Sequence, residues 1–200
     1  MDNLISALRR FDRVAVPLDG RRHAAVAIAI CGGEAGDGDD GPAIWLTRRA
    51  PKMRNHPGQF ALPGGSLDPG EDAVSAALRE LSEEIGVTAG REAVLGLLDD
   101  YATRSGFVIT PVVVRAGDGR DPRVNPAEVA ELHRITFREL GVEPRFLAIP
   151  ESDRPVIQLP LIGHLVHAPT AAVLYQFAEL AIYGRKTRVA HLEQPVFAWR

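Results

Sequence analysis

Residues 65–87 read GSLDPGEDAVSAALRELSEEIGV and contain the clearest predicted helix of the chain, Glu71 to Ile85. The Pro69-Gly70 pair before it is typical of a tight turn, and Gly86 is typical of a helix C-cap. At about 100° per residue, four apolar side chains fall within one narrow stripe of this helix. They are Val74, Leu78, Leu81 and Ile85. The stripe predicts that one face of the helix packs against a sheet.

A second arc of the same helix carries three glutamates, Glu80, Glu83 and Glu84, and we expect this acidic face to turn outwards. Their spacing places neighbouring carboxylates about one turn apart. Like charges this close destabilise a bare helix, whereas a divalent cation would neutralise them. Carboxylate oxygens suit a hard ion, so the pattern is compatible with Mg²⁺ or Mn²⁺. On these three residues alone, a solvated acidic face without any metal is the leading alternative.

Two adjacent glycines, Gly64 and Gly65, lie just before this helix and its entry turn. Glycine backbones adopt geometries that other residues avoid. We therefore expect this pair to bring a backbone carbonyl oxygen close to a metal ion held by the helix. With the glycines included, the metal site becomes the favoured interpretation of the glutamates.

The spacing within residues 65–87 resembles the Nudix box at every defining position. Gly65 is followed after five residues by Glu71, and after seven more by RELSEEIGV, residues 79–87. The resemblance implies an α+β fold, the Nudix α/β/α sandwich with a mixed sheet. It also implies a metal-dependent hydrolase that cleaves a nucleoside diphosphate linked to another moiety, a small-molecule nucleotide substrate.

The same resemblance implies roles for individual residues of the box. Glu80, Glu83 and Glu84 would hold Mg²⁺ or Mn²⁺, with the Gly64 carbonyl as a further ligand. Arg79 would orient the glutamates by ion pairing. Such an ion would neutralise charge on the diphosphate and make a water more acidic.

A carboxylate would complete the deprotonation of the attacking water. The candidates for this base are Glu83 and Glu80 on the helix, and Glu128, because members of the family also place the base on a loop. An exposed charge at a strand edge is the alternative for Glu128. For Glu71 the alternatives are support of the loop, indirect metal binding, or a capping glutamate in the first helical turn.

A second resemblance covers residues 46–65, LTRRAPKMRNHPGQFALPGG. It is similar to the upstream motif of the coenzyme A (CoA) diphosphatase branch, which cleaves CoA and its thioesters to phosphopantetheine derivatives and adenosine 3′,5′-bisphosphate. Substrate phosphates would explain a group of residues beside the acidic site: Arg48, Arg49, Arg54, His56 and Gly65. Cations that merely offset the acidic helix are the alternative. Leu62 and Ala50 depart from the branch, which usually has phenylalanine and often serine there.

The other segments predict strands and helices that mix without strict alternation, which also favours an α+β sandwich. The expected strands are Ala24–Ile30, Ala43–Thr47, Val94–Tyr101, Phe107–Arg115, Glu128–Thr136 and Val156–Ile162. The expected helices lie within Met1–Arg13, at Phe137–Leu140 and at Thr170–Tyr183, the last with Thr170 as N-cap. Residues 32–42 predict a mobile hairpin loop, and residues 185–200 give no clear pattern. The absence of a long linker indicates one domain over residues 1–200.

Composition limits the function classes. A net charge of −3 gives no basic surplus for general nucleic-acid binding. Apolar runs are too short for a membrane span, and the single cysteine, Cys31, predicts a buried thiol rather than a disulfide. We expect a cytoplasmic protein, with a homodimer as one option.

Three alternatives to a CoA diphosphatase stay open. The first is a Nudix diphosphatase for ADP-ribose, dinucleotides or nucleoside triphosphates. The second is a catalytically inactive Nudix domain that binds nucleotides for regulation, although the three metal glutamates are intact. The third is a structural helix with an acidic face, which predicts no metal binding.

Overall fold

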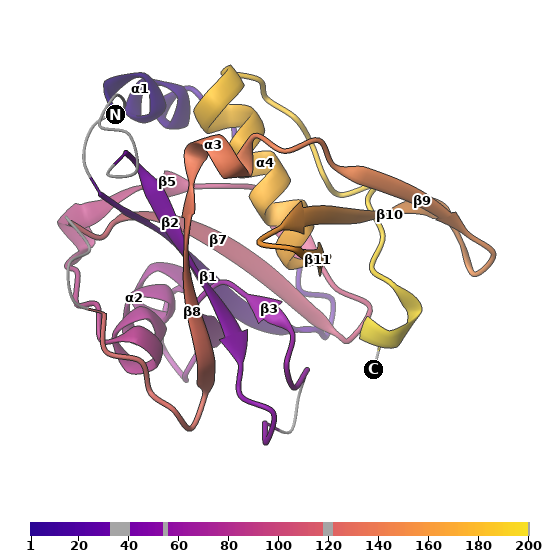
Figure 1. Cartoon of the computed structure of the whole chain (residues 1–200), viewed down its shortest axis with the longest axis horizontal. Coiled ribbons are helices and arrows are strands. Elements are labelled where there is room, and N and C mark those ends of the chain that lie inside the picture. Colours follow the sequence, from indigo (N-terminus) through magenta and orange to yellow (C-terminus); the bar gives the residue numbers. More distant parts are fainter. Residues whose placement is uncertain (33–40, 54–55, 118–121, 200) are drawn as a thin grey trace.

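The computed structural model describes residues 1–32, 41–53, 56–117 and 122–199 (Figure 1). Most of the expected hairpin loop, residues 33–40, therefore lies outside the described residues. The helices and short 3-10 turns are α1 (Asp2–Arg9), α2 (Ala73–Ile85), η2 (Arg91–Ala93), α3 (Phe137–Leu140), α4 (Thr170–Tyr183) and η3 (Val196–Ala198). The strands are β1 (Arg22–Cys31), β2 (Ala43–Arg49), β3 (Phe60–Ala61), β4 (Gly64–Ser66), β5 (Val94–Leu97), β6 (Tyr101–Ala102), β7 (Phe107–Arg115), β8 (Val129–Thr136), β9 (Arg145–Ile149), β10 (Ser152–Leu161) and β11 (His164–His167).

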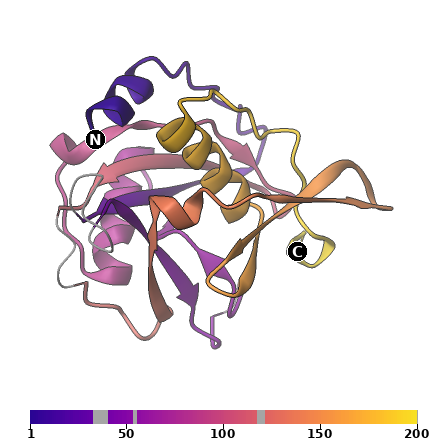
Figure 2. The ribbon, with the colours of Figure 1, turned by 45° about the horizontal axis from the view of Figure 1, so that its top comes forward.

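A mixed sheet forms the centre of the fold. Its order is β3-β2-β1-β7-β5, with β4 paired to β1, β6 to β7 and β8 to β2. β1 and β7 run parallel, and the other pairs are antiparallel. The helix α2 covers one face, whereas α1 and α4 pack on the other (Figures 1 and 2). The expected α/β/α sandwich with a mixed sheet is confirmed.

β1 is apolar on both faces because helices cover both. Ala25, Ala27 and Ala29 belong to the core beneath α2, while Ile28 and Ile30 belong to the core beneath α4. Successive strand side chains point to opposite faces, so an unbroken apolar run is what a doubly covered strand requires. Cys31 is buried at the end of this strand, as expected.

A second sheet, β9-β10-β11, extends from the body beside α4 (Figure 1). The sequence indicated only part of β10. Its partner β9 is mostly exposed, so it lacks the apolar pattern that would predict a strand.

The structure corrects two expected element boundaries. The strand expected over Val94–Tyr101 is interrupted after Leu97, because Asp99 N donates to Gln176 Oε1 (3.1 Å) and Asp100 N to the Val14 carbonyl (3.0 Å) instead of continuing the ladder. Thr170 is not the N-cap of α4. It is the first residue of the helix, after Pro169, and its hydroxyl donates to the Phe60 carbonyl at 3.2 Å.

Other expected elements agree with the structure. The amphipathic N-terminal helix forms at α1, with Leu4 and Leu8 buried. Within the described residues, no helix combines the length and apolar character needed to cross a membrane.

Candidate active site

Helix α2 begins and ends as its sequence dictates. Asp72 is the N-cap and accepts a hydrogen bond from Ser75 N at 2.7 Å, so the helix starts two residues later than expected. Gly86 ends it in the left-handed conformation, with φ of 70°. Leu81 and Ile85 are fully buried against the sheet, and Val74 and Leu78 pack partly buried beside them. The predicted apolar stripe is confirmed.

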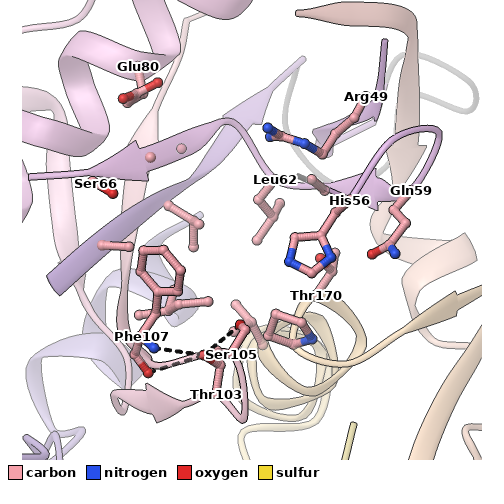
Figure 3. A pocket seen from close by; sticks show the side chains of 18 of the residues that line it. Arg49, His56, Gln59, Leu62, Ser66, Glu80, Thr103, Ser105, Phe107 and Thr170 are labelled. Carbon is pink, nitrogen blue, oxygen red and sulfur yellow. Dashed lines mark hydrogen bonds between the residues drawn. The ribbon is translucent and has the colours of Figure 1, made fainter. Parts of the chain in front are cut away.

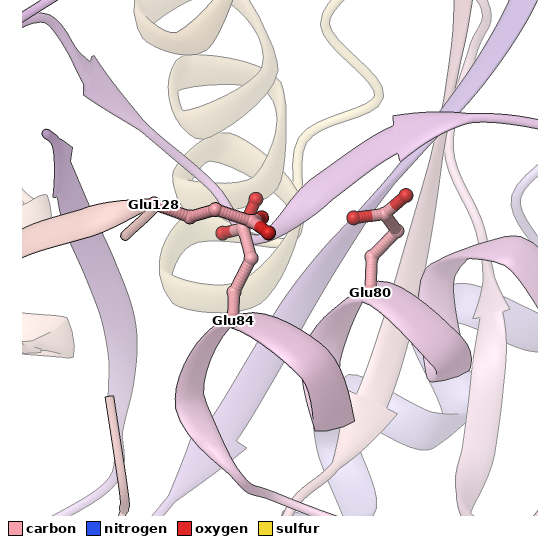
Figure 4. Close-up of side chains that lie close together, drawn as sticks. All are labelled: Glu80, Glu84 and Glu128. Atoms are coloured by element: carbon pink, nitrogen blue, oxygen red, sulfur yellow. The ribbon is translucent and has the colours of Figure 1, made fainter. Parts of the chain in front are cut away.

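The acidic arc of α2 does not turn outwards as a whole, so that expectation was wrong. Only 3% of Glu84 is exposed, and the backbone of Gly64, which precedes the helix, donates a hydrogen bond to it. Glu80, Glu84 and Glu128 each offer a carboxylate oxygen, and these oxygens lie within 4.8 Å of one another (Figure 4). Glu83 is outside this group, with 55% of its side chain exposed.

Burial raises the pKa values of two carboxylates in this group. It raises the pKa of Glu84 to about 8, although nearby Arg49 lowers it, and Glu80 and Glu128 raise it further. Burial likewise raises the pKa of Glu80, against the effect of Arg79. Three clustered carboxylates with oxygen ligands only, two of them with raised pKa values, fit a hard divalent cation.

Gly64 and Gly65 begin β4 and lie close to β1 and to Glu80. A Cβ on Gly65 would lie 2.2 Å from Glu80 Oε1, and a Cβ on Gly64 would lie 2.4 Å from the Ala25 carbonyl oxygen. Gly64 therefore excludes any larger residue because it faces backbone atoms, whereas a larger residue at Gly65 would displace the Glu80 carboxylate. That the Gly64 carbonyl binds metal stays a prediction.

Arg79 connects the entry loop to the glutamates. Its guanidinium donates to Glu71 (3.0 and 3.1 Å), to Glu80 Oε1 (2.8 Å) and to Glu83 Oε2 (3.1 Å). Glu71 precedes the helix and also accepts from Asp68 N at 2.9 Å, so it supports the loop and is not a first-turn cap. That Arg79 orients the glutamates stays a prediction, with which these ion pairs are compatible.

A cavity of about 430 Å³ adjoins the carboxylate group. Glu80, Glu84, Glu128 and Gly65 line it, together with Arg49 and His56 from the upstream segment (Figure 3). The Nε of Arg49 is buried without a hydrogen-bond partner among the described residues. Burial and then Arg49 lower the pKa of His56, which favours its neutral form.

A family model for the NUDIX domain matches residues 21–159. This chain belongs to the Nudix hydrolase family. A protein of Photorhabdus laumondii named uncharacterized Nudix hydrolase NudL is 33% identical over 167 residues, which are 80% of this chain and 86% of that relative. A protein with the same name from Yersinia enterocolitica is 40% identical over 119 residues, 58% of this chain and 57% of its own length.

Solved structures agree on the fold. A MutT/nudix family protein from Enterococcus faecalis has a TM-score of 0.54 at 16% identity, over 80% of this chain and 62% of its own. A NUDIX hydrolase from Alicyclobacillus acidocaldarius has a TM-score of 0.53 at 21% identity, over 79% of this chain and 91% of its own. At these identities the likeness concerns the fold alone.

The upstream residues of this Nudix hydrolase separate into two groups. Arg49 and His56 reach the cavity, whereas Arg48 is not among the residues that line it. Arg48 instead pairs with Glu131 at 2.8 Å across the β2–β8 ladder and lies over the Phe60 ring. Arg54 lies outside the described residues.

Sequence reasoning missed the other end of the cavity. Arg22, Thr103, Ser105, Phe107 and Gln194 line it. For Arg22 a signal existed. Arg22 lies four residues before Val26 in β1, and because strand side chains alternate, both point to the face that lines the cavity. Gln194 had no signal, since the C-terminal segment shows no periodicity.

Proposed function

We propose that this Nudix hydrolase cleaves the diphosphate bond of CoA or acyl-CoA, giving a phosphopantetheine derivative and adenosine 3′,5′-bisphosphate. One observation carries the proposal. The segment that resembles the upstream motif of the CoA branch brings Arg49 and His56 into the same cavity as the three clustered glutamates. The motif thus contributes to the site instead of lying elsewhere on the surface.

Arg49 is suited to bind a substrate phosphate. Its Nε is buried and lacks an acceptor among the described residues, and an unpaired buried donor is costly. Glu84 is a charge near Arg49, but among the described residues no hydrogen-bond acceptor is found for the Arg49 side chain. Arg49 also lines the cavity, where its guanidinium can bind a phosphate through two hydrogen bonds.

Glu80, Glu84 and Glu128 would hold Mg²⁺ or Mn²⁺, with Glu83 and the Gly64 carbonyl as further candidate ligands. When bound, the ion supplies charge neutralisation for the diphosphate and makes a water more acidic. The chain's own contribution is to exclude solvent from this end of the cavity and to fix the carboxylates. Arg79 fixes Glu80 through the 2.8 Å contact between Nη1 and Oε1.

The base that takes the proton of the attacking water is one of Glu128, Glu80 and Glu83. The cluster geometry favours Glu128 and Glu80, because both line the cavity. Glu83 is more exposed and ion-paired with Arg79, so its proposed role as metal ligand or base requires a side-chain movement towards the cavity.

The test is a substrate panel with purified protein in Mg²⁺ or Mn²⁺. We expect CoA to be hydrolysed with higher kcat/KM than ADP-ribose, NADH or dGTP, with adenosine 3′,5′-bisphosphate identified as a product by mass spectrometry. A clear preference for another member of the panel would replace CoA by that substrate. Nucleotide binding without turnover of any member would instead support the inactive regulatory domain.

Three further expectations stay predictions. They are the organisation of residues 1–200 as one domain, a cytoplasmic location, and homodimeric assembly, which light scattering on the purified protein would measure. None of them affects the assignment of the cavity.

A further inference from the structure

The cavity has a second polar end, away from the carboxylates. Figure 3 shows Thr103, Ser105 and Phe107 grouped there, apart from Glu80 and Arg49. The segment between the two ends is lined by small or apolar side chains, among them Ala24, Leu62 and Ile109. His56 and Thr170 also line the cavity between Arg49 and Ser105, so a ligand that spans it meets both apolar and polar side chains on the way (Figure 3).

Arg22 provides the positive charge of this end. It begins β1 and pairs with Phe107 in the parallel ladder, so its guanidinium lies 4.0 Å from the centre of the Phe107 ring. Among the described residues, no carboxylate forms an ion pair with it. The ring fixes the guanidinium by cation–π contact and leaves its N–H groups available to a ligand.

Gln194 provides a buried donor at the same end. Only 1% of the residue is exposed, yet it lines the cavity. Its Oε1 accepts from Arg104 N at 2.7 Å, which directs the amide. In the described part of the chain, no acceptor is found for its Nε2. Its Nε2 can therefore donate to a ligand in the cavity.

The C-terminal segment holds Gln194 in this position. Its backbone N–H donates to Glu193 Oε1 at 2.9 Å, and its carbonyl accepts from Trp199 Nε1 at 2.9 Å. Glu193 in turn is ion-paired with Arg104, from the turn that also carries Thr103 and Ser105. The Arg104–Glu193 ion pair and the hydrogen bond from Arg104 N to Gln194 thus connect two segments that are distant in sequence.

We infer that Arg22 and Gln194 bind a phosphate monoester of the substrate, distinct from the diphosphate that is cleaved. A guanidinium and an amide N–H are donors that match phosphate oxygens. Gly65, beside Glu80, pairs with Ala25, which is three residues from Arg22 or about 10 Å along a strand. That separation places the second anion beyond the sugar that carries the diphosphate. The inference rests on the proposed function, because CoA carries such a phosphate at the 3′ position of its ribose.

A binding experiment tests the inference without turnover. Calorimetry compares adenosine 3′,5′-bisphosphate with AMP, which lacks the second phosphate. We expect the bisphosphate to bind about tenfold more tightly to the wild-type protein, equal to about 1.4 kcal/mol. In Arg22→Gln this ratio should fall to about twofold or less. Arg21→Gln is the matched control, because Arg21 does not line the cavity, and it should keep the wild-type ratio.

A second variant tests the amide. Gln194→Glu keeps the acceptor for Arg104 N and places a carboxylate where the donor was, so it should lower bisphosphate affinity more than AMP affinity. If circular dichroism shows that this variant is unfolded, the comparison of Arg22→Gln with Arg21→Gln decides alone. Equal affinity of the wild-type protein for the two ligands, or an unchanged ratio in Arg22→Gln, would overturn the inference.

Hydrolysis separates this inference from the proposed function. The kcat/KM ratio of CoA to dephospho-CoA should fall about tenfold in Arg22→Gln and stay at the wild-type value in Arg21→Gln. If CoA is hydrolysed and Arg22→Gln leaves that ratio unchanged, the proposed function stands and the phosphate site fails. If CoA is not hydrolysed but the bisphosphate preference depends on Arg22, the phosphate site stands and the proposed substrate fails.

Discussion

Glu84 and Glu193 are equally buried, with 3% and 2% of the residue exposed, but their pKa values move in opposite directions. Burial raises the pKa of Glu84 to about 8. Burial also acts to raise the pKa of Glu193, but hydrogen bonds from Arg104, Gln194 N and Ser152 lower it to about 2. The chain completes the surroundings of Glu193 with its own donors and leaves those of Glu84 incomplete.

From this difference we predict a structural role for Glu193 and a functional one for Glu84. Arg104 Nη2 and Ser152 Oγ lie 2.5 and 2.9 Å from Glu193 Oε2, so its charge is already compensated. Glu84 shares its site with two other carboxylates, and the charge of Arg49 and a backbone hydrogen bond from Gly64 do not offset its burial. A buried charge without compensation is unfavourable, and folds retain one where a ligand or cation completes the site.

The sharpest way to break the comparison is to remove the charge of Glu84. We expect Glu84→Gln to lower kcat by about 1,000-fold, equal to about 4 kcal/mol, because an amide cannot balance the charge of a divalent ion. Steady-state hydrolysis of CoA in Mg²⁺ measures this. Glu143→Gln, at an exposed position, should keep wild-type activity. A folded Glu84→Gln protein with the wild-type rate would remove Glu84 from the site.

In metal-free protein, the raised pKa of Glu84 should make the free energy of unfolding depend on pH. The pKa of folded Glu84, about 8, lies above its ordinary value of 4.5. Between these pH values the folded state holds a proton that the unfolded state has released, so Glu84 makes stability fall as pH rises from about 4.5 to about 8. The expected loss is on the order of 3 kcal/mol.

Chemical denaturation in chelator at pH 5 and pH 8 measures this effect. Glu84→Gln should be more stable than the wild-type protein at pH 8 and nearly equal to it at pH 5. Saturating Mn²⁺ should restore the wild-type stability at pH 8 and have less effect on the variant. Identical pH profiles of the two metal-free proteins would show that burial does not raise the pKa of Glu84.

The position of Glu84 on α2, on the same face as Glu80, was predictable from the sequence. The spacing of Glu80 and Glu84 fixes their common face on α2, and the entry and exit signals fix the helix itself. The inward direction of Glu84 was not predictable, because it depends on the segment around Glu128 closing over the helix. That contact joins residues more than 40 positions apart in sequence.

Arg48 and Arg49 show the same limit in a strand. Adjacent residues of a regular strand point to opposite faces, but the β2–β8 register shifts between Arg48 and Arg49, so alternation alone does not decide which of them reaches the cavity. No strand register could be assigned to this segment from the sequence, so nothing there distinguished the two arginines. The ladder of β2 with β8, in which Arg48 is opposite Glu131, makes the choice. The environment of Glu193 depends on a C-terminal segment without periodicity, and no sequence signal could have indicated it.

The smallest expected effect concerns Glu193, whose charge is compensated. Its depressed pKa contributes stability that is fully present above pH 4.5 and is lost as pH falls towards 2. We expect Glu193→Gln to lower the free energy of unfolding at pH 7 by about 2 kcal/mol, since the charged hydrogen bonds to Arg104 and Ser152 weaken. The variant should also lose part of the acid sensitivity between pH 4.5 and 2.

Urea denaturation across this pH range, with Asp153→Asn as the exposed neighbouring control, measures the loss. The metal response should then distinguish the two glutamates. Because Glu193 contacts no residue of the carboxylate group, Glu193→Gln should gain as much stability from Mn²⁺ at pH 8 as the wild-type protein does. A variant that lost both stability and the Mn²⁺ response would show that the two ends of the cavity are coupled through the fold, and the separation of a structural from a functional carboxylate would fail.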